Sequence, residues 1–386
     1  FYPDNAWTRE KDGSPRAPRD MATDTMPEFM GVKVNPISSV PQAKLTRVEE
    51  VKHSIGGIVG KSRHGYTLDC RQNLSYRAAT ALLRAGIRLR RATEPVQCGD
   101  IILPAGSFIV EHDRKLLEEL ASSLGVTFYA VSDEPKSTEV KKSHVGIYQR
   151  YYGGNADEGW TRFVLEEFGF EYETLRDEDV DEGLRGRLDV VVLPSDPAWA
   201  IVGDIEKHFK ETGSQPPNAP PEYRSGLHGE ELKALVRFVS EGGTLVCLNE
   251  SSMFAVDAFS LSLGDALHGL PSKEFFCPAS TLHARVDTRH PLGYGMAEDS
   301  LLFFWDGPAF TVKPCVDSER YEVVARYPDH VVLESGWLDG EKHLAGRAAL
   351  VVARVGSGRV VLFGFRPQHR AQTDGAYKLL FNSLLL

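Results

Sequence analysis

Residues 144–170 constrain the fold of this chain most, because they predict a strand, a tight turn and a helix in direct succession. A short apolar run over 145–148 has the length and composition of a buried strand. Gly153 and the glycine after it then permit a sharp turn, since glycine adopts backbone angles that other residues resist. Asn155 is a favourable N-cap, and Glu158 three residues later completes a capping-box pattern. Such a unit opens a doubly wound α/β domain, whose ligands usually bind beyond the carboxyl ends of the strands.

The helix after this turn is expected to bury one apolar side, formed by residues that repeat at helical spacing: Trp160, Phe163, Val164 and Phe168. Further strands are expected over 171–175, 190–193 and 244–248, of which 190–193 is wholly apolar, and the periodicity of 230–240 predicts an amphipathic helix. Beyond residue 265 the sequence is rich in short strand patterns, with a hairpin signal at 356–358.

These patterns divide the chain into three parts. Residues 1–60 are rich in proline and read as an extended arm, and 61–135 read as a small α/β domain. A charged linker follows, and 143–386 read as a doubly wound, flavodoxin-like α/β domain with a β-rich C-terminal portion. Within it, residues 203–227 hold many prolines and glycines and are expected to form a long irregular insertion.

Charge and cysteine usage exclude several classes of protein. The net charge is −10 and there is no long basic run, which argues against nucleic-acid binding. No apolar stretch approaches the ~20 residues that a membrane-spanning helix needs. The five cysteines form no CxxC pair, and their pairing stays open: Cys70, Cys98, Cys247, Cys277 and Cys315.

Polar side chains follow three of the predicted strands and provide a candidate ligand site: Asn155, Asp157, Trp160, Ser195, Asp196, Glu250 and Ser251. Strand ends in open α/β sheets meet at one crevice, so these residues are expected to lie close together. Each also has a structural interpretation. Asn155 and Ser251 suit helix caps, Trp160 suits the core, and Asp196 before a proline suits a turn. A pairing of Asp157 with Glu250 would support hydrolysis, but they form no complete catalytic set.

One short segment resembles a metal-binding motif. Residues His228 to Glu231 spell His-x-x-Glu, but the two glutamates fall in the first turn of a predicted helix, where acidic side chains favour the helix dipole. We therefore predict no metal site and no bound zinc in this chain.

Several longer segments resemble a known family: YYGGNADEGWTRFVLEEFGF, VVVLPS, EELKALVRFVSEGGTLVCLNESS and GSGRVVLFGFRPQHRAQTDGAYKLLFNSLL. They look like the C-terminal region of secreted bacterial zinc carboxypeptidase-like (metallocarboxypeptidase) proteins. There a zinc peptidase domain comes first and a domain similar to class I glutamine amidotransferases follows.

The resemblance implies a non-catalytic accessory region that supports or shapes access to a peptidase site outside this chain. Zinc would be held by that upstream domain, and the protein would be secreted or periplasmic. The upstream domain or another chain would pack on the 1–60 arm. The alternative is a stand-alone module that binds or hydrolyses a small polar or sugar-like ligand in the crevice.

Amidotransferase chemistry needs a cysteine nucleophile on a strand-to-helix elbow, with a histidine base and an acid that orients it. Cys247 lies on the appropriate strand but in the middle of its apolar run, with the turn expected at 250–252. His369 has no glutamate in the His-x-Glu arrangement of the active enzymes. We therefore predict a structural Cys247 and no glutaminase activity.

Overall fold

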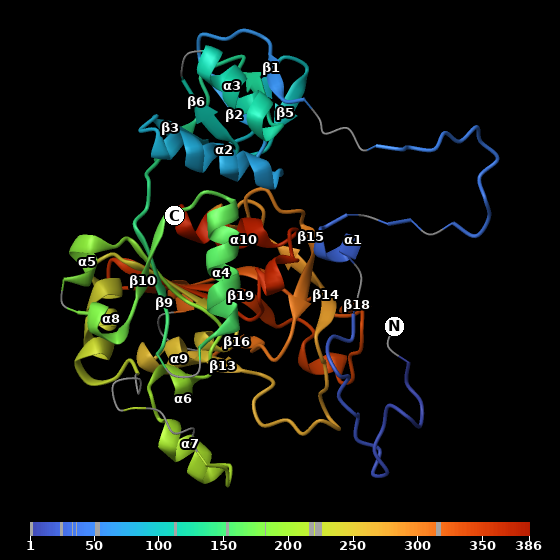
Figure 1. Ribbon diagram of the computed structural model, residues 1–386, viewed down its shortest axis with the longest axis vertical. Coiled ribbons are helices and arrows are strands. Elements are labelled where there is room, and N and C mark those ends of the chain that lie inside the picture. Colours follow the sequence, from blue (N-terminus) through green and yellow to red (C-terminus); the bar gives the residue numbers. More distant parts are fainter. Residues whose placement is uncertain are drawn as a thin grey trace. The chain divides into compact units, whose positions relative to one another are not determined.

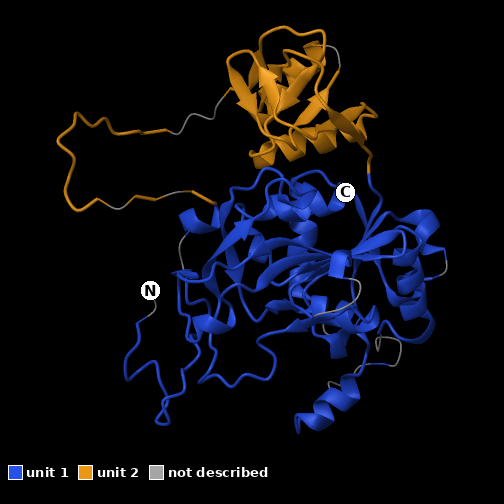
Figure 2. Ribbon diagram, turned by 180° about the vertical axis from the view of Figure 1, so that it is seen from behind, with its two compact units in different colours: residues 1–30, 143–386 blue, residues 31–142 orange. Residues whose placement is uncertain are grey.

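The computed structural model describes residues 3–23, 26–32, 34–35, 37–50, 55–111, 114–151, 154–181, 183–215, 220, 226–313 and 318–386. The chain forms two compact units (Figure 2). The large unit comprises residues 1–30 and 143–386, and the small unit comprises residues 31–142. Gly153, Cys315 and part of the expected insertion at 203–227 lie outside the described residues. The described part of that insertion is not wholly irregular, because it contains helix α7 (Ile205–Glu211).

The large unit contains five parallel strands, β9 (Val145–Tyr148), β10 (Tyr172–Leu175), β11 (Val190–Leu193), β12 (Thr244–Leu248) and β20 (Gly358–Phe363). They pair in the order β10-β9-β11-β12-β20. Numbered along the chain this is 2-1-3-4-5, the flavodoxin-like order, which confirms the predicted doubly wound fold. In this order the chain reverses direction across the sheet between β9 and β11, where ligands of such folds bind.

Every residue of β9, β11 and β12 is buried, because helices cover the sheet (Figure 1). Val191 and Leu193 of β11 pack in one core with residues of α5 (Leu184–Arg187), α8 (Gly229–Ser240) and α9 (Ser251–Ala258). Val190 and Val192 alternate to the opposite face and are equally buried. Helix α4 (Ala156–Glu167) contacts β9.

Beyond β20 the same sheet continues with antiparallel strands, as the β-rich C-terminal sequence predicts. Strand β19 (Ala348–Val355) forms a hairpin with β20, and β17 (Tyr321–Arg326), β14 (Ser280–Val286) and β15 (Asp299–Phe304) follow. The short strands β13 (Leu263–Asp265), β16 (Phe310–Val312) and β18 (Leu333–Ser335) pair at its margin. Helix α10 (Tyr377–Leu384) closes the chain.

The N-terminal residues differ from the single arm expected over 1–60, because residues up to 30 pack on the large unit. The Phe29 ring lies edge-on to Phe303 at 5.6 Å and is buried, at the end of helix α1 (Met26–Phe29). Arg9 forms an ion pair with Asp339 at 3.0 Å. Apolar and charged side chains of this proline-rich stretch thus attach it to the rest of the large unit.

Helix α4 buries only part of the apolar side predicted for it: Val164 and Phe168 are buried, but the other two residues are not. Trp160 and Phe163 are 38% and 52% exposed, and their rings contact each other 6.0 Å apart. The buried side instead carries Glu158 and Thr161 together with Val164. The prediction of a buried Trp160 is wrong because polar residues with local partners occupy the inward positions. Glu158 pairs with Arg162, for example.

The small unit has a six-stranded sheet in the order β1-β7-β2-β6-β3-β8. These strands are β1 (Gly57–Val59), β2 (Tyr66–Leu68), β3 (Leu89–Ala92), β6 (Phe108–Val110), β7 (Thr127–Ala130) and β8 (Ser137–Val140). Helices α2 (Asn73–Arg84) and α3 (Arg114–Leu124) complete it, with a hairpin of β4 (Val96–Cys98) and β5 (Ile101–Leu103). The small domain was expected to begin at residue 61, but its sheet already starts with β1 at Gly57.

Within the described parts of both units, no helix is long and apolar enough to cross a membrane.

Candidate functional site

Eight polar or charged residues gather beyond the carboxyl ends of the parallel strands, and we call them the strand-end cluster: Arg150, Asn155, Asp157, Ser195, Asp196, Asn249, Glu250 and Arg366. They come from the segments that follow β9, β11, β12 and β20. The cluster includes five of the seven residues predicted from sequence.

Asn155 has both of the roles considered for it. Its Oδ1 accepts hydrogen bonds from the backbone N–H of Asp157 at 2.9 Å and of Glu158 at 3.4 Å, which caps α4. Its Nδ2 donates to the Ser195 carbonyl at 3.0 Å and to Asp196 Oδ2 at 3.2 Å. This single side chain therefore fixes the β9–α4 turn against the segment after β11.

Asp196 forms a buried ion pair with Arg150. Arg150 Nε lies 2.5 Å from Asp196 Oδ2, and the side chains are 14% and 8% exposed. Burial raises the pKa of Asp196, while Arg150 and the Asn155 amide partly oppose that rise. Arg150 has no counterpart in the sequence prediction, which considered only acidic and neutral residues near this turn.

Arg366 joins the two carboxylates whose pairing the sequence suggested. Its Nε donates to Asp157 Oδ2 at 2.9 Å, and its Nη2 lies 3.5 Å from Glu250 Oε2. Its Nη1 donates to the Trp305 carbonyl, and its guanidinium lies 5.8 Å from the centre of the Trp305 ring. Asp157 and Glu250 are thus brought together by a cation directly after β20.

Glu250 is held loosely compared with its neighbours. Its closest partners are Ser195 Oγ at 3.4 Å and Arg366 at 3.5 Å, and its side chain is 37% exposed. Burial of the carboxylate raises its pKa; Arg366 opposes this, and the charges of Asp306 and Asp196 add to it. Glu250 therefore has acceptor capacity that the protein leaves largely unused. Shifted carboxylates are typical of functional sites.

The strand-to-helix elbow after β12 carries an asparagine. Asn249 has φ 55°, a left-handed conformation, and is fully buried. Its Nδ2 donates to Ser195 Oγ and to the Trp305 carbonyl, both at 3.2 Å, while its Oδ1 has no partner among the described residues. The turn therefore comes at Asn249, one residue earlier than predicted.

Cys247 lies two residues before this elbow, inside the core. It is fully buried, and burial raises the pKa of its thiol far above the usual range. Its side chain belongs to the core formed with α8 and α9. The prediction that Cys247 is a buried structural residue agrees with this position, because a nucleophilic cysteine requires exposure and a stabilised thiolate.

Trp160 and Ser251 lie outside the strand-end cluster. Trp160 is on the outer side of α4. Ser251 is fully buried, and its Oγ lies 2.9 Å from both the Leu193 and Leu248 carbonyl oxygens. It also does not cap α9, because Glu250 occupies the N-cap position.

His369 lies near the cluster but is enclosed by aromatic rings. It stacks on Phe303 at 4.1 Å and meets Trp305 at 5.6 Å. Neither ring nitrogen has a hydrogen-bond partner among the described residues. Burial, with smaller effects of Arg366 and Arg370, lowers its pKa to about 3. Without an acid that orients it, His369 is not suited to act as the base for a nucleophile at the elbow.

The described residues contain no group of three or more His, Cys, Asp or Glu side chains suited to a metal ion. In the His-x-x-Glu segment, His228 Nδ1 lies 2.8 Å from the Gly226 carbonyl, and Glu230 pairs with Lys233 at 2.6 Å. These local partners account for both side chains.

Neither a scan against protein-family models nor a search of curated proteins matches this chain. Solved structures with similar folds include a cytoplasmic protein from Salmonella typhimurium, with 11% identity over 62% of this chain and 97% of that one, at TM-score 0.37. A ThuA-like protein from Bacteroides uniformis has 11% identity over 65% and 94%, at TM-score 0.37. A GMP synthase subunit from Thermoplasma acidophilum has 11% identity over 62% and 94%, at TM-score 0.37.

These neighbours are ThuA-like and amidotransferase-like folds, and nothing in them shows a carboxypeptidase parent. At this identity and TM-score they carry no argument about chemistry. The doubly wound fold of the large unit rests on its own strand order and pairing.

Proposed function

We propose that the large unit is a non-catalytic recognition module whose strand-end cluster binds a small, neutral, polyhydroxylated ligand. The observation that carries this proposal is the Arg366 guanidinium, which contacts both Asp157 and Glu250. A guanidinium, which only donates hydrogen bonds, thus lies beside two carboxylates, which when ionised only accept them. These groups lie at the edge of the sheet where such folds bind ligands.

Hydroxyl groups complement this arrangement. Ionised carboxylates only accept hydrogen bonds and guanidinium groups only donate them, whereas a hydroxyl does both. Adjacent hydroxyls of a sugar or polyol would therefore donate to Glu250 and accept from Arg366 at the same time. The loose contacts of Glu250 leave its oxygens available for this role.

Binding fits these residues better than hydrolysis. Hydrolysis by a carboxylate pair needs two carboxyl groups that act separately, one as acid and one as base or nucleophile. Asp157 is instead held in an ion pair by Arg366, which also contacts Glu250 and opposes the rise that burial gives to the pKa of Glu250. Glutaminase chemistry finds no nucleophile at the elbow, because Asn249 stands there and Cys247 is buried in the core.

The proposal is tested by titrating the full chain with neutral mono- and disaccharides and following tryptophan fluorescence and heat. We expect Glu250→Gln to weaken binding of a sugar at least tenfold, or about 1.4 kcal/mol. Glu241→Gln is the matched control, because Glu241 is exposed at the end of α8. Absence of binding at millimolar concentrations, or an equal loss in both variants, would refute the proposal.

We further propose that this module is an accessory region of a secreted or periplasmic zinc metallocarboxypeptidase-like protein, in which it supports or shapes access to the peptidase site. This part rests on sequence resemblance alone, and its partner would be the upstream peptidase domain or another chain at the arm. The coding sequence ahead of Phe1 tests it. We expect a His-x-x-Glu peptidase domain there, whereas a start codon with a signal peptide would contradict it.

A further inference from the structure

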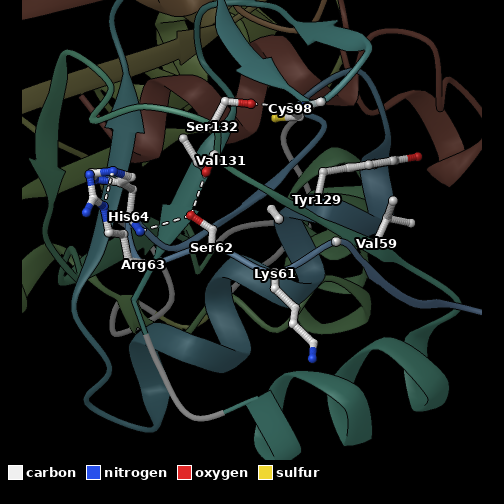
Figure 3. Close-up of a pocket in the computed structure, with 12 residues that line it drawn as sticks. Val59, Lys61, Ser62, Arg63, His64, Cys98, Tyr129, Val131 and Ser132 are labelled. Carbon is white, nitrogen blue, oxygen red and sulfur yellow. Dashed lines mark hydrogen bonds between the residues drawn. The ribbon is translucent and has the colours of Figure 1, made fainter.

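The small unit contains a pocket of about 360 Å³, within the range of small-ligand sites (Figure 3). It is lined by Val59, Gly60, Lys61, Ser62, Arg63, His64, Cys98, Gly99, Tyr129, Ala130, Val131 and Ser132. The 61–64 loop runs along it, with Val59 and Tyr129 on the side opposite His64. All of these residues belong to the small unit.

The charge of the lining is entirely basic, although the chain carries a net charge of −10. Lys61, Arg63 and His64 line the pocket, and no carboxylate does. Among the described residues, neither Lys61 nor Arg63 has an ion-pair partner. Glu134 lies 3.4 Å from His64 and is bound more closely by Arg90, at 2.6 Å. Two cations thus border the pocket, and the part of the chain that the structure describes offers neither of them a carboxylate partner.

Hydrogen bonds hold the 61–64 loop in a defined shape. Ser62 Oγ donates to the Val131 carbonyl at 2.5 Å and accepts from the backbone N–H of His64 at 2.9 Å. Gly60 has φ 82°, and a Cβ there would lie 2.9 Å from Ala130 Cβ, so the turn into the loop requires glycine. Arg63 Nε donates to His64 Nε2 at 3.1 Å. A loop that is already ordered loses little entropy when a ligand binds.

We propose that this pocket binds a small organic oxyanion, with Lys61 and Arg63 as its charge partners and Tyr129 beside its apolar body. The volume exceeds the space of one inorganic ion, so the anionic group is attached to a small organic part. Cys98 also lines the pocket, and burial raises the pKa of its thiol to about 11, so the thiol stays protonated at neutral pH.

Calorimetric titration of the full chain tests the proposal with three probes: phenyl phosphate, benzoate and neutral benzyl alcohol. At least one anion is expected to bind with a Kd of about 1 mM or tighter at low salt, and benzyl alcohol is not. Binding of phenyl phosphate alone assigns the site to phosphates, and binding of both anions assigns it to oxyanions in general.

Two single variants locate the site. Lys61→Gln and Arg63→Gln should each weaken anion binding tenfold or more, and added salt should weaken it further. Lys141→Gln is the matched control, because it removes one exposed positive charge from the same unit without touching the pocket. The proposal is overturned if neither anion binds, if benzyl alcohol binds equally well, or if Lys141→Gln has the same effect. It does not depend on the strand-end cluster.

Discussion

The buried imidazole of His369 predicts that acid weakens the large unit in a specific pH range. The ring is 4% exposed, stacks on Phe303 and has no hydrogen-bond partner on either nitrogen among the described residues. Its pKa is lowered from 6.5 to about 3, first by burial and then by Arg366 and Arg370. The folded state therefore holds it neutral while the unfolded chain takes up a proton.

The magnitude follows from this shift. Above pH 6.5 both states carry neutral imidazole, and the full stability is present. As the pH falls toward 3, the unfolded state binds one more proton than the folded state. The free energy of unfolding then decreases by about 1.4 kcal/mol per pH unit. At pH 4.5 the loss due to His369 is about 2.7 kcal/mol relative to pH 7.5.

His369→Leu and His369→Phe remove this titration and test the reasoning. Urea unfolding is followed by tryptophan fluorescence from pH 7.5 to 4.5, because all five tryptophans lie in the large unit. The two variants differ in packing, so their stabilities at pH 7.5 will differ. Each should nevertheless gain about 2.7 kcal/mol relative to the wild type by pH 4.5. Cys247→Ala is the control, because a cysteine stays neutral in both states over this range. Parallel pH profiles for wild type and both His369 variants would refute the argument.

The remaining predictions concern Cys247, Trp160 and the N-terminal segment. Cys247→Ala should cost about 1 kcal/mol of stability; native thiol labelling should leave Cys247 unmodified, and the wild-type chain should show no glutamine turnover. Rapid alkylation of Cys247 would contradict this. Trp160→Ala should cost at most about 1 kcal/mol, because the ring is partly exposed and pairs mainly with Phe163; a loss near 3 kcal/mol in urea unfolding would mean a buried ring. Trypsin should cut first in the exposed stretch 37–50, at Lys44 or Arg47, and later at Arg9, which is ion-paired to the large unit. Equal rates, measured by mass spectrometry, would argue against docking of residues 3–30.

The sequence was sufficient to predict the parallel strands of the large unit but not which strands lie next to each other. A fully apolar run such as 190–193 identifies a strand buried on both faces. The hairpin around Ser357 was equally clear, since glycines flank it on both sides. The placement of β20 beside β12 depends on contacts between residues more than a hundred positions apart in the sequence. Local sequence patterns do not predict such contacts.

The members of the candidate site could be predicted where their place after a parallel strand is enough to bring them together. Asp157, Asp196 and Glu250 follow parallel strands, and topology brings such positions together. Arg366 was missed because an arginine after a strand resembles an ordinary surface residue, although it also follows a parallel strand of the same sheet. The prediction for Trp160 was wrong for a different reason. Its helical spacing fits an apolar side, but Glu158 and Thr161 occupy inward positions of the helix, where they accept hydrogen bonds from glutamine side chains. The indole is therefore left on the outer side.

The arrangement that amidotransferase chemistry requires differs from this sheet edge at more than one residue. Alternation along β12 directs Cys247 into the core formed with α8 and α9, so no small shift of the backbone would expose its thiol at the elbow. The elbow itself is filled by Asn249, whose Nδ2 ties it to Ser195 and to the Trp305 carbonyl. His369 is enclosed by Phe303 and Trp305 and has no hydrogen-bonded acid among the described residues, so it would be a poor base for a thiol placed at the elbow. Cys247, the elbow residue Asn249 and His369 are each held by packing or by hydrogen bonds at the strand ends. This edge of the sheet therefore presents a set of fixed donors and acceptors, and the proposed recognition function rests on them.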